Sequence, residues 1–271
     1  MVRTIHALPE CASLSRNPGI PESIIPESIR VSDPQPRLAP NGDTALAVEF
    51  GERIDRATSE RVLALHDRLA RAGLPGVVEL LPTFRSLMVH YDPARTSRAK
   101  LVRRIEPLLD RLEGDRAAAR RWTIPVCYDP AFALDLDEVA ARTSLTPAEV
   151  IAHHSSIPYH VYMIGFLPGY PYLGDLPQRL ALPRRENPRT QVPAGSVAIA
   201  TTMTAVYTLA SPGGWHILGR TPAALWSQHR DPPAVLAPGD EVRFAPIDRD
   251  EFARLAHRAE AGELELESTS A

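Results

Sequence analysis

The stretch from Pro158 to Pro222 concentrates residue types that can bind a small anion. It holds seven of the 15 glycines, nine of the 27 prolines and five arginines against two acids, in a chain of formal charge −3. Glycine lets the backbone approach a ligand closely, and proline stiffens the loops that carry it. Arginines in stiff loops can bind carboxylate or phosphate groups through paired N–H donors. The composition therefore predicts a site for a small anionic ligand.

A second interpretation of the same stretch stays open on composition alone. A small β-barrel needs glycine and proline at its corners whatever it binds. The arginines can also reflect a coding bias, because Lys100 is the only lysine among 30 basic residues.

Several other kinds of site are not indicated. The chain contains no GxxxxGK[ST] phosphate loop and no GxSxG nucleophile elbow. Cys11 and Cys127 lie far apart without a CxxC pair, so neither a disulfide framework nor a zinc site is predicted. His153 and His154 are neighbours on a helix and point in different directions, which argues against a metal pair. We therefore expect no integral metal.

Charge and hydropathy exclude further classes of protein. A net charge of −3 argues against a nucleic-acid partner, which favours a basic surface. No apolar run approaches the roughly 18 residues of a membrane span, and the N-terminus lacks the apolar stretch of a signal peptide. We expect a cytoplasmic protein without a membrane partner. The proline content, about twice the average share, argues against a long helical bundle.

The elements that must position the anion site are predicted to be mainly strands. Five short β-rich runs are separated by glycine- and proline-containing turns: residues 159–164, 196–201, 205–209, 215–219 and 241–244. This spacing is typical of a barrel or folded sandwich. Helices are predicted at residues 134–141, after Thr146, where Thr146 and Glu149 form a capping box around Pro147, and at residues 249–259.

Upstream, hydrophobic periodicity predicts a separate α+β domain at residues 41–128. Strands are expected at residues 44–50, 77–81, 86–91 and 122–128. Helices are expected from Arg56 to a stop at Gly73, and from Ser97 through a kink at Pro107. The resulting order, βαββαβ, is that of ferredoxin-like domains. No set of residues with catalytic spacing falls in this domain, so we expect its role to be docking or structural support rather than catalysis.

The ends of the chain complete the expected organisation. Residues 1–40 carry seven prolines and balanced charge, which predicts a flexible leader, with a partner-binding peptide as the alternative. Residues 129–271 are assigned to the β-barrel domain and its flanking helices.

Ordered motifs in the anion-binding stretch resemble the KipI/PxpB family, also called allophanate hydrolase subunit 1. The matching blocks run in order through the stretch: VYMIGFLPGYPYLG at residues 161–174, LPRR at 182–185, NPRT at 187–190, VPAGSV at 192–197, SPGGW at 211–215 and GRTP at 219–222. Residues 41–93 resemble the family's N-terminal domain. The chain departs from the family at His216, where glutamine is expected, and at Asp175, where glycine is common.

The resemblance implies an α+β fold with an N-terminal domain and a cyclophilin-like β-barrel. It implies a subunit of ATP-dependent 5-oxoprolinase, inactive alone, which opens 5-oxoproline to L-glutamate with a PxpC-type partner (allophanate hydrolase subunit 2 type) and a PxpA-type protein. ATP, with Mg, is expected at a site shared with the partner. Two alternatives stay open: an inhibitor of a histidine kinase, and a carboxyltransferase-type component of urea or allophanate metabolism.

Candidate site residues follow from that chemistry. A lactam carbonyl is a poor electrophile, so its activation requires cations for carboxylate and phosphoryl charge, and fixed amides. The candidate cations are Arg184, Arg185, Arg189 and Arg220. The candidate amides lie at Gly195, Ser196, Gly213 and Gly214. Tyr170 and Trp215 are candidate pocket walls, although such residues more often pack in a core, and His160 is either a catalytic or a structural histidine.

Overall fold

The computed structural model describes residues 35–112 and 119–271. Most of the predicted leader, residues 1–34, lies outside the described residues. Its last residues contribute to a strand, β1 (Arg37–Asn41), which pairs antiparallel with β2 (Ala45–Glu49). Within the described part of the chain, no helix combines the length and apolarity needed to cross a membrane.

The N-terminal sheet has four antiparallel strands in the order β1-β2-β4-β3. Its other members are β3 (Val77–Pro82) and β4 (Ser86–Tyr91), and two helices pack on it, α1 (Arg56–Ala72) and α2 (Arg98–Ile105). Local signals set the bounds of α1. The Asp55 carboxylate accepts a hydrogen bond from the Thr58 amide at 2.8 Å, and Gly73 ends the helix in a left-handed conformation.

The predicted ferredoxin-like order is wrong in its last strand. The strand expected at residues 122–128 is β5 (Arg120–Cys127), and it belongs to the other sheet. A β-rich run indicates an extended segment but not its neighbour, and here Trp122, Ile124 and Val126 lie in the core of that other sheet. The sequence also predicted a kinked helix at Pro107. Instead α2 ends at Ile105 and a 3-10 helix, η3 (Glu106–Leu109), follows, with proline near its start.

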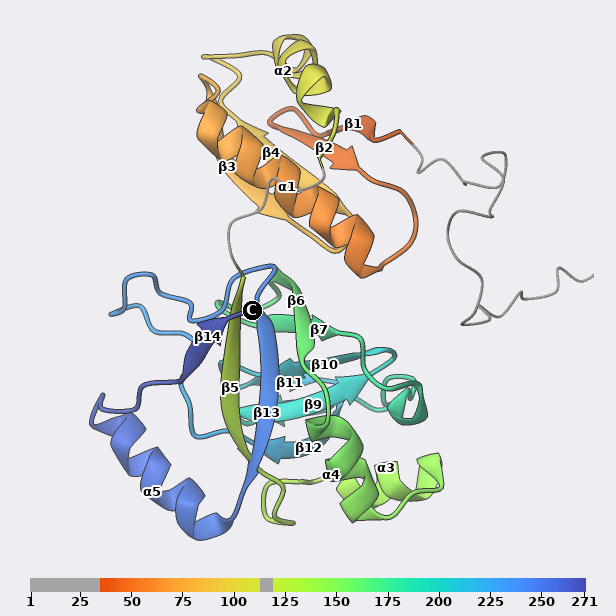
Figure 1. Ribbon diagram of the computed structural model, residues 1–271, viewed down its shortest axis with the longest axis vertical. Helices are drawn as coiled ribbons and strands as arrows, with labels where there is room; N and C mark the ends of the chain where they lie inside the picture. The colour runs from red at the N-terminus through yellow and green to blue at the C-terminus, as the bar shows by residue number, and fades with distance from the viewer. Residues whose placement is uncertain (1–34, 113–118) are drawn as a thin grey trace, which may run out of the picture. The chain divides into compact units, whose positions relative to one another are not determined.

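Seven strands of the second sheet close into a barrel in the order β12-β9-β10-β7-β6-β13-β5 (Figure 1). Closure occurs where β12 pairs with β5 at Arg220 and Cys127, and β14 is added beside β5. The strands are β6 (Tyr159–Ile164), β7 (Pro171–Gly174), β9 (Ser196–Ala200), β10 (Met203–Val206), β12 (His216–Arg220), β13 (Glu241–Ile247) and β14 (Ser268–Ser270).

All five predicted barrel runs contain strand, although the run at 205–209 begins earlier in the structure, as β10. The sequence missed β7 and a small two-stranded sheet of β8 (Arg189–Val192) and β11 (Ser211–Gly213), because proline and glycine interrupt these segments. The helices are α3 (Leu136–Thr143), α4 (Pro147–Ser155), α5 (Arg249–Glu260) and the short 3-10 helix η4 (Gln178–Leu180). The capping box of Thr146 and Glu149 is confirmed.

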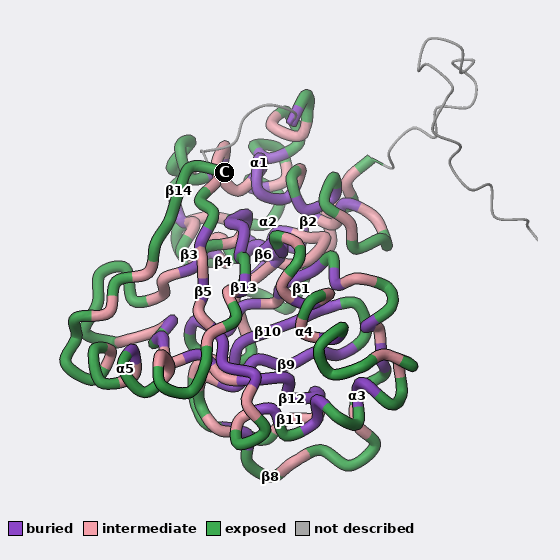
Figure 2. Tube along the Cα trace, turned by 60° about the horizontal axis from the view of Figure 1, so that its bottom comes forward, coloured by how far each residue is buried: buried purple, intermediate pink, exposed green. Residues whose placement is uncertain are grey.

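Strands β9, β10 and β12 are buried on both faces, as Figure 2 shows. Val197, Ile199 and Leu218 belong to one core, which contains residues of every strand in the closed barrel and of α3 and α4. Ala198 and Ile217 belong to a second core with Tyr170, Tyr207, Trp215 and Val192 of β8. The stretch that predicted an anion site is therefore also a structural layer of the barrel.

His154, one of the two neighbouring histidines on α4, is fully buried in a chain of hydrogen bonds. The Thr204 hydroxyl donates to the carbonyl of Ala198, which leaves its oxygen to accept from Nε2 of His154 at 2.9 Å. The Tyr128 hydroxyl then donates to Nδ1 at 2.8 Å. This pattern satisfies a neutral imidazole, and burial lowers the pKa of His154 from 6.5 to about 3.

This burial predicts a loss of stability in acid. Between pH 6.5 and about 3 the unfolded chain binds a proton at His154 that the folded chain excludes. The associated stability is present above pH 6.5 and falls by up to about 1.4 kcal/mol for each pH unit below it. We expect His154→Gln to flatten this part of the profile in urea denaturation from pH 7.5 to 4.5. Parallel profiles for the two proteins would contradict the assignment.

Candidate functional site

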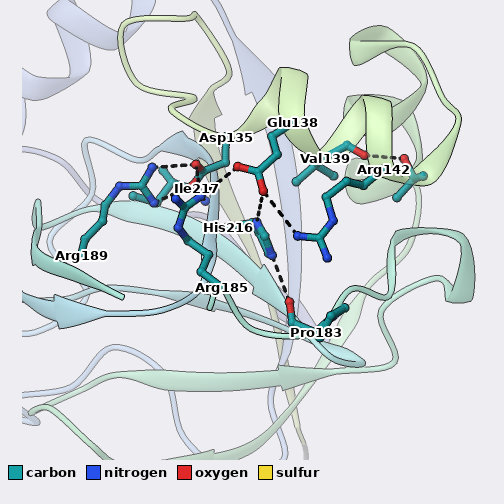
Figure 3. A network of polar contacts seen from close by, with 10 residues as sticks. Asp135, Glu138, Val139, Arg142, Pro183, Arg185, Arg189, His216 and Ile217 are labelled. Atoms are coloured by element: carbon teal, nitrogen blue, oxygen red, sulfur yellow. Dashed lines mark hydrogen bonds and ion pairs between the residues drawn. The ribbon is translucent and has the colours of Figure 1, made fainter. Parts of the chain in front are cut away.

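Two of the predicted arginines converge on one buried carboxylate, Asp135, which sits at the start of α3 (Figure 3). Arg189 donates two hydrogen bonds to it, at 2.8 and 2.6 Å, and Arg185 donates a third at 2.8 Å. The amide of Ile217 on β12 donates a fourth, at 2.7 Å. The Asp135 side chain is 2% exposed, so these bonds replace its lost hydration.

A second carboxylate, Glu138, lies one turn further along α3. It accepts from Arg185 at 3.0 Å and from Arg142 at 3.4 Å. His216 approaches the same carboxylate with Nδ1 at 3.9 Å, while its Nε2 donates to the carbonyl of Pro183 at 3.0 Å (Figure 3). His216, the residue that departs from the family pattern, therefore ties the arginine-bearing loop to strand β12 through this hydrogen bond to Pro183.

Arg184 differs from its two neighbours in the predicted cation set. It is exposed, and within residues 35–112 and 119–271 it has no ion pair or hydrogen bond. An open pocket of about 440 Å³ is lined by Glu138, Arg142, Pro183, Arg184, Arg185, Glu186 and Asn187. Because Glu138 is already paired, the unpaired guanidinium of Arg184 is the group in this pocket best placed to receive an anion.

An aromatic cluster lies within the electrostatic reach of Arg184. Tyr170 makes edge-to-face contacts with Tyr172, Tyr207 and Trp215 at centroid distances of 5.1, 5.2 and 6.4 Å. Burial raises the pKa of all three tyrosines, and the positive charge of Arg184 opposes the rise at each. Tyr170 and Trp215 are buried, whereas Tyr172 is partly exposed. Tyr172 is therefore the cluster member best able to touch a ligand.

The predicted amide donors at Gly195 and Ser196 are used within the chain, and Gly213 is paired with Arg189 in the sheet of β8 and β11. Gly195 donates to the Tyr207 carbonyl at 2.7 Å, and the Ser196 amide donates to the Pro193 carbonyl at 3.3 Å. Gly213 packs against the Tyr207 hydroxyl with no room for a side chain. Gly214 accepts from the amide of Arg185 at 2.8 Å. These backbone contacts position the loops that carry the arginines.

The remaining candidates lie apart from the Asp135 network. His160 is buried on β6 and shares a hydrogen bond of 3.0 Å with Ser59 of α1, which gives it a structural partner. Arg220, at the far end of β12 from His216, stacks on Phe132 with its guanidinium carbon 5.0 Å from the ring centroid.

The sequence prediction missed the acids that organise the arginines. Asp135 and Glu138 lie in a predicted helix, where acids near the N-terminus are expected for the helix dipole alone. Nothing local distinguishes a capping acid from one that pairs with an arginine some 50 residues away. Within the described residues, no group of three or more His, Cys, Asp or Glu side chains could hold a metal ion.

Comparison with known proteins identifies the family. Residues 36–236 match the family model of the carboxyltransferase domain, subdomains C and D. The B component of 5-oxoprolinase from Bacillus subtilis (strain 168) is 39% identical over 222 residues, covering 78% of this chain and 92% of that protein. The chain belongs to this family of 5-oxoprolinase B components. The member from Escherichia coli O157:H7 is 40% identical over 205 residues, covering 76% of this chain and 93% of that protein.

Solved structures agree with the fold of this family member. The crystal structure of TTHA0988 superimposes with a TM-score of 0.68 at 40% identity and covers 75% of this chain. The chain spans 40% of the length of TTHA0988. The urea carboxylase of Kluyveromyces lactis gives a TM-score of 0.72 at 20% identity, over 87% of this chain and 24% of that one. That likeness concerns the fold alone.

Removing the charge of Asp135 tests its role as the anchor. Asp135→Asn leaves Arg185 and Arg189 without their shared anion, so we expect the free energy of unfolding to fall by about 3 kcal/mol. Glu138→Gln is the matched control, because its side chain is 45% exposed, and it should cost less than about 1 kcal/mol. Urea denaturation at neutral pH measures both. Equal losses of unfolding free energy in the two variants would contradict the role of Asp135 as the anchor.

Proposed function

We propose that this chain is the B component of an ATP-dependent 5-oxoprolinase, a hydrolase that opens 5-oxoproline to L-glutamate. The observation that carries the proposal is the 39–40% identity to two 5-oxoprolinase B components over more than nine tenths of their length. The chain acts with a PxpC-type and a PxpA-type protein and is inactive alone. Its barrel is of the cyclophilin-like type.

The pocket at Arg184 suits the substrate. 5-Oxoproline carries one carboxylate on a small, nearly planar lactam ring. Arg184 supplies a guanidinium without a competing carboxylate partner, and its positive charge reaches the partly exposed Tyr172. A bidentate pairing with Arg184 would fix the carboxylate and orient the lactam. Arg185 and Arg189 support this loop through Asp135.

The reaction also requires activation of the lactam carbonyl. ATP, bound with Mg at a site shared with the PxpC-type partner, supplies a phosphoryl group that turns the carbonyl oxygen into a better leaving group. Transfer of that group to the lactam oxygen releases ADP. One water then adds at the carbonyl carbon and the C–N bond breaks, with the nitrogen leaving as the amine. A second water hydrolyses the resulting acyl phosphate to glutamate and phosphate. This chain's own contribution is to hold anionic groups with fixed guanidinium donors.

The alternatives are separable from this proposal by experiment. The likeness to urea carboxylase is at 20% identity and supports a shared fold, which gives no specific support to a role in urea metabolism. Turnover of 5-oxoproline by the chain purified with its PxpC- and PxpA-type partners, dependent on ATP, supports the oxoprolinase. Inhibition of a histidine kinase by the chain alone, with no turnover in the reconstituted set, would overturn it.

Arg184→Gln in the reconstituted enzyme tests the substrate pocket. Loss of a charge-assisted hydrogen bond to the substrate carboxylate should raise KM for 5-oxoproline about tenfold or more, with a smaller change in kcat. Arg179→Gln is the matched control, because Arg179 is also an exposed arginine and lies on η4, outside the pocket. A KM unchanged in Arg184→Gln, or raised equally in both variants, would move the carboxylate site elsewhere.

A further inference from the structure

Arg220 stands out because its guanidinium is partly desolvated without a counter-charge. Its Nε is buried and has no hydrogen-bond partner, and no ion pair joins it to any described acid. Its two Nη nitrogens are likewise unbonded but keep access to solvent. Burial lowers the pKa of Arg220, which reflects the cost of holding a cation there alone. Arg185 and Arg189, in contrast, are neutralised by Asp135.

A second unsatisfied group lies directly across from Arg220. Ser196 on β9 is its antiparallel partner in the sheet, so the two side chains leave the same face about 5 Å apart. The Ser196 hydroxyl oxygen is buried and has no partner either. Buried polar groups are normally hydrogen-bonded, so two orphaned groups at paired positions indicate a missing polar ligand.

The surroundings hold Arg220 in place. Its guanidinium stacks on Phe132, which in turn packs on Phe252 of α5 with ring centroids 4.4 Å apart. The turn before β9 passes close to the arginine side chain: a Cβ added at Gly195 would lie 2.5 Å from the Thr221 carbonyl and 3.2 Å from Cγ of Arg220. A guanidinium fixed in this way loses little further entropy when it binds an anion.

This location is separate from the pocket at Arg184. His216, which contacts the carbonyl of Pro183, begins β12, and Arg220 ends it. Four residues of extended chain separate the two by about 13 Å. A ligand at one position therefore does not fill the other.

We propose that Arg220 and Ser196, beside the ring of Phe132, form a second binding site, which takes the oxyanion group of a small molecule. The shared chemistry is a carboxylate or phosphoryl oxygen that accepts from the guanidinium and from the serine hydroxyl. Anion binding at this position is a property of the chain alone and does not depend on the proposed enzymatic function.

Isothermal titration of the full chain with inorganic phosphate, and separately with 5-oxoproline, tests the site. We expect saturable binding in at least one arm, weakened about tenfold or more by Arg220→Gln and several-fold by Ser196→Ala. Arg179→Gln should bind as the unsubstituted chain does, because that residue carries the same charge away from the site.

The two titrations distinguish a phosphoryl ligand from a carboxylate ligand, and they can also overturn the proposed site. Arg220-dependent binding of phosphate identifies a phosphoryl site, and Arg220-dependent binding of 5-oxoproline identifies a carboxylate site. No saturable binding in either arm, or equal affinity in Arg220→Gln and the unsubstituted chain, overturns the proposal. If Arg220→Gln unfolds, Ser196→Ala decides, since it removes a single oxygen: unchanged affinity there overturns the proposal as well.

Discussion

The buried carboxylate of Asp135 is the constraint on which the arrangement of the arginine loop depends. It joins three segments that are distant in sequence: the start of α3, the arginine-bearing residues 185–189, and the backbone of β12. A carboxylate that is 2% exposed would be costly by itself. Four hydrogen bonds, three of them from guanidinium groups, offset that cost only in one geometry, so the anchor specifies the loop as well as stabilising it.

Asp135 also distinguishes four arginines that are equivalent by composition, because it pairs with only two of them. Arg185 and Arg189 have their charge neutralised, so any anion that approaches them must compete with a fixed carboxylate at 2.6 to 2.8 Å. Arg184 and Arg220 have no such competitor within the described residues. Arg184 and Arg185 are neighbours in the sequence, yet they differ in whether a carboxylate neutralises them. Arg185 and Arg189 are paired with Asp135 and support the structure, whereas Arg184 and Arg220 have no carboxylate partner among the described residues.

Features encoded by neighbouring residues could be predicted from the sequence, and features encoded by distant ones could not. Asp55, Gly73 and Thr146 act on backbone groups within one helical turn, so their pattern is visible in a short window. The placement of β5 depends on its pairing with β13, more than 100 residues later, and the partner of Arg189 is 54 residues earlier. The family resemblance indicated the stretch that carries the candidate arginines, but it carried no information on which charges are paired.

The glycines of the arginine-bearing stretch support one of its two interpretations, the corners of a small β-barrel, whereas other residues support the anion site. A Cβ on Gly219 would lie 2.7 Å from the carbonyl of Cys127, at the point where β12 meets β5 and closes the barrel. A Cβ on Gly195 would strike the Thr221 carbonyl, and Gly195 also has a positive φ of 78°. Both glycines are therefore required by contacts within the protein, as the corners of a small barrel demand. Arg220 and Ser196 differ from them, because no part of the described chain satisfies their buried polar atoms, and a ligand would.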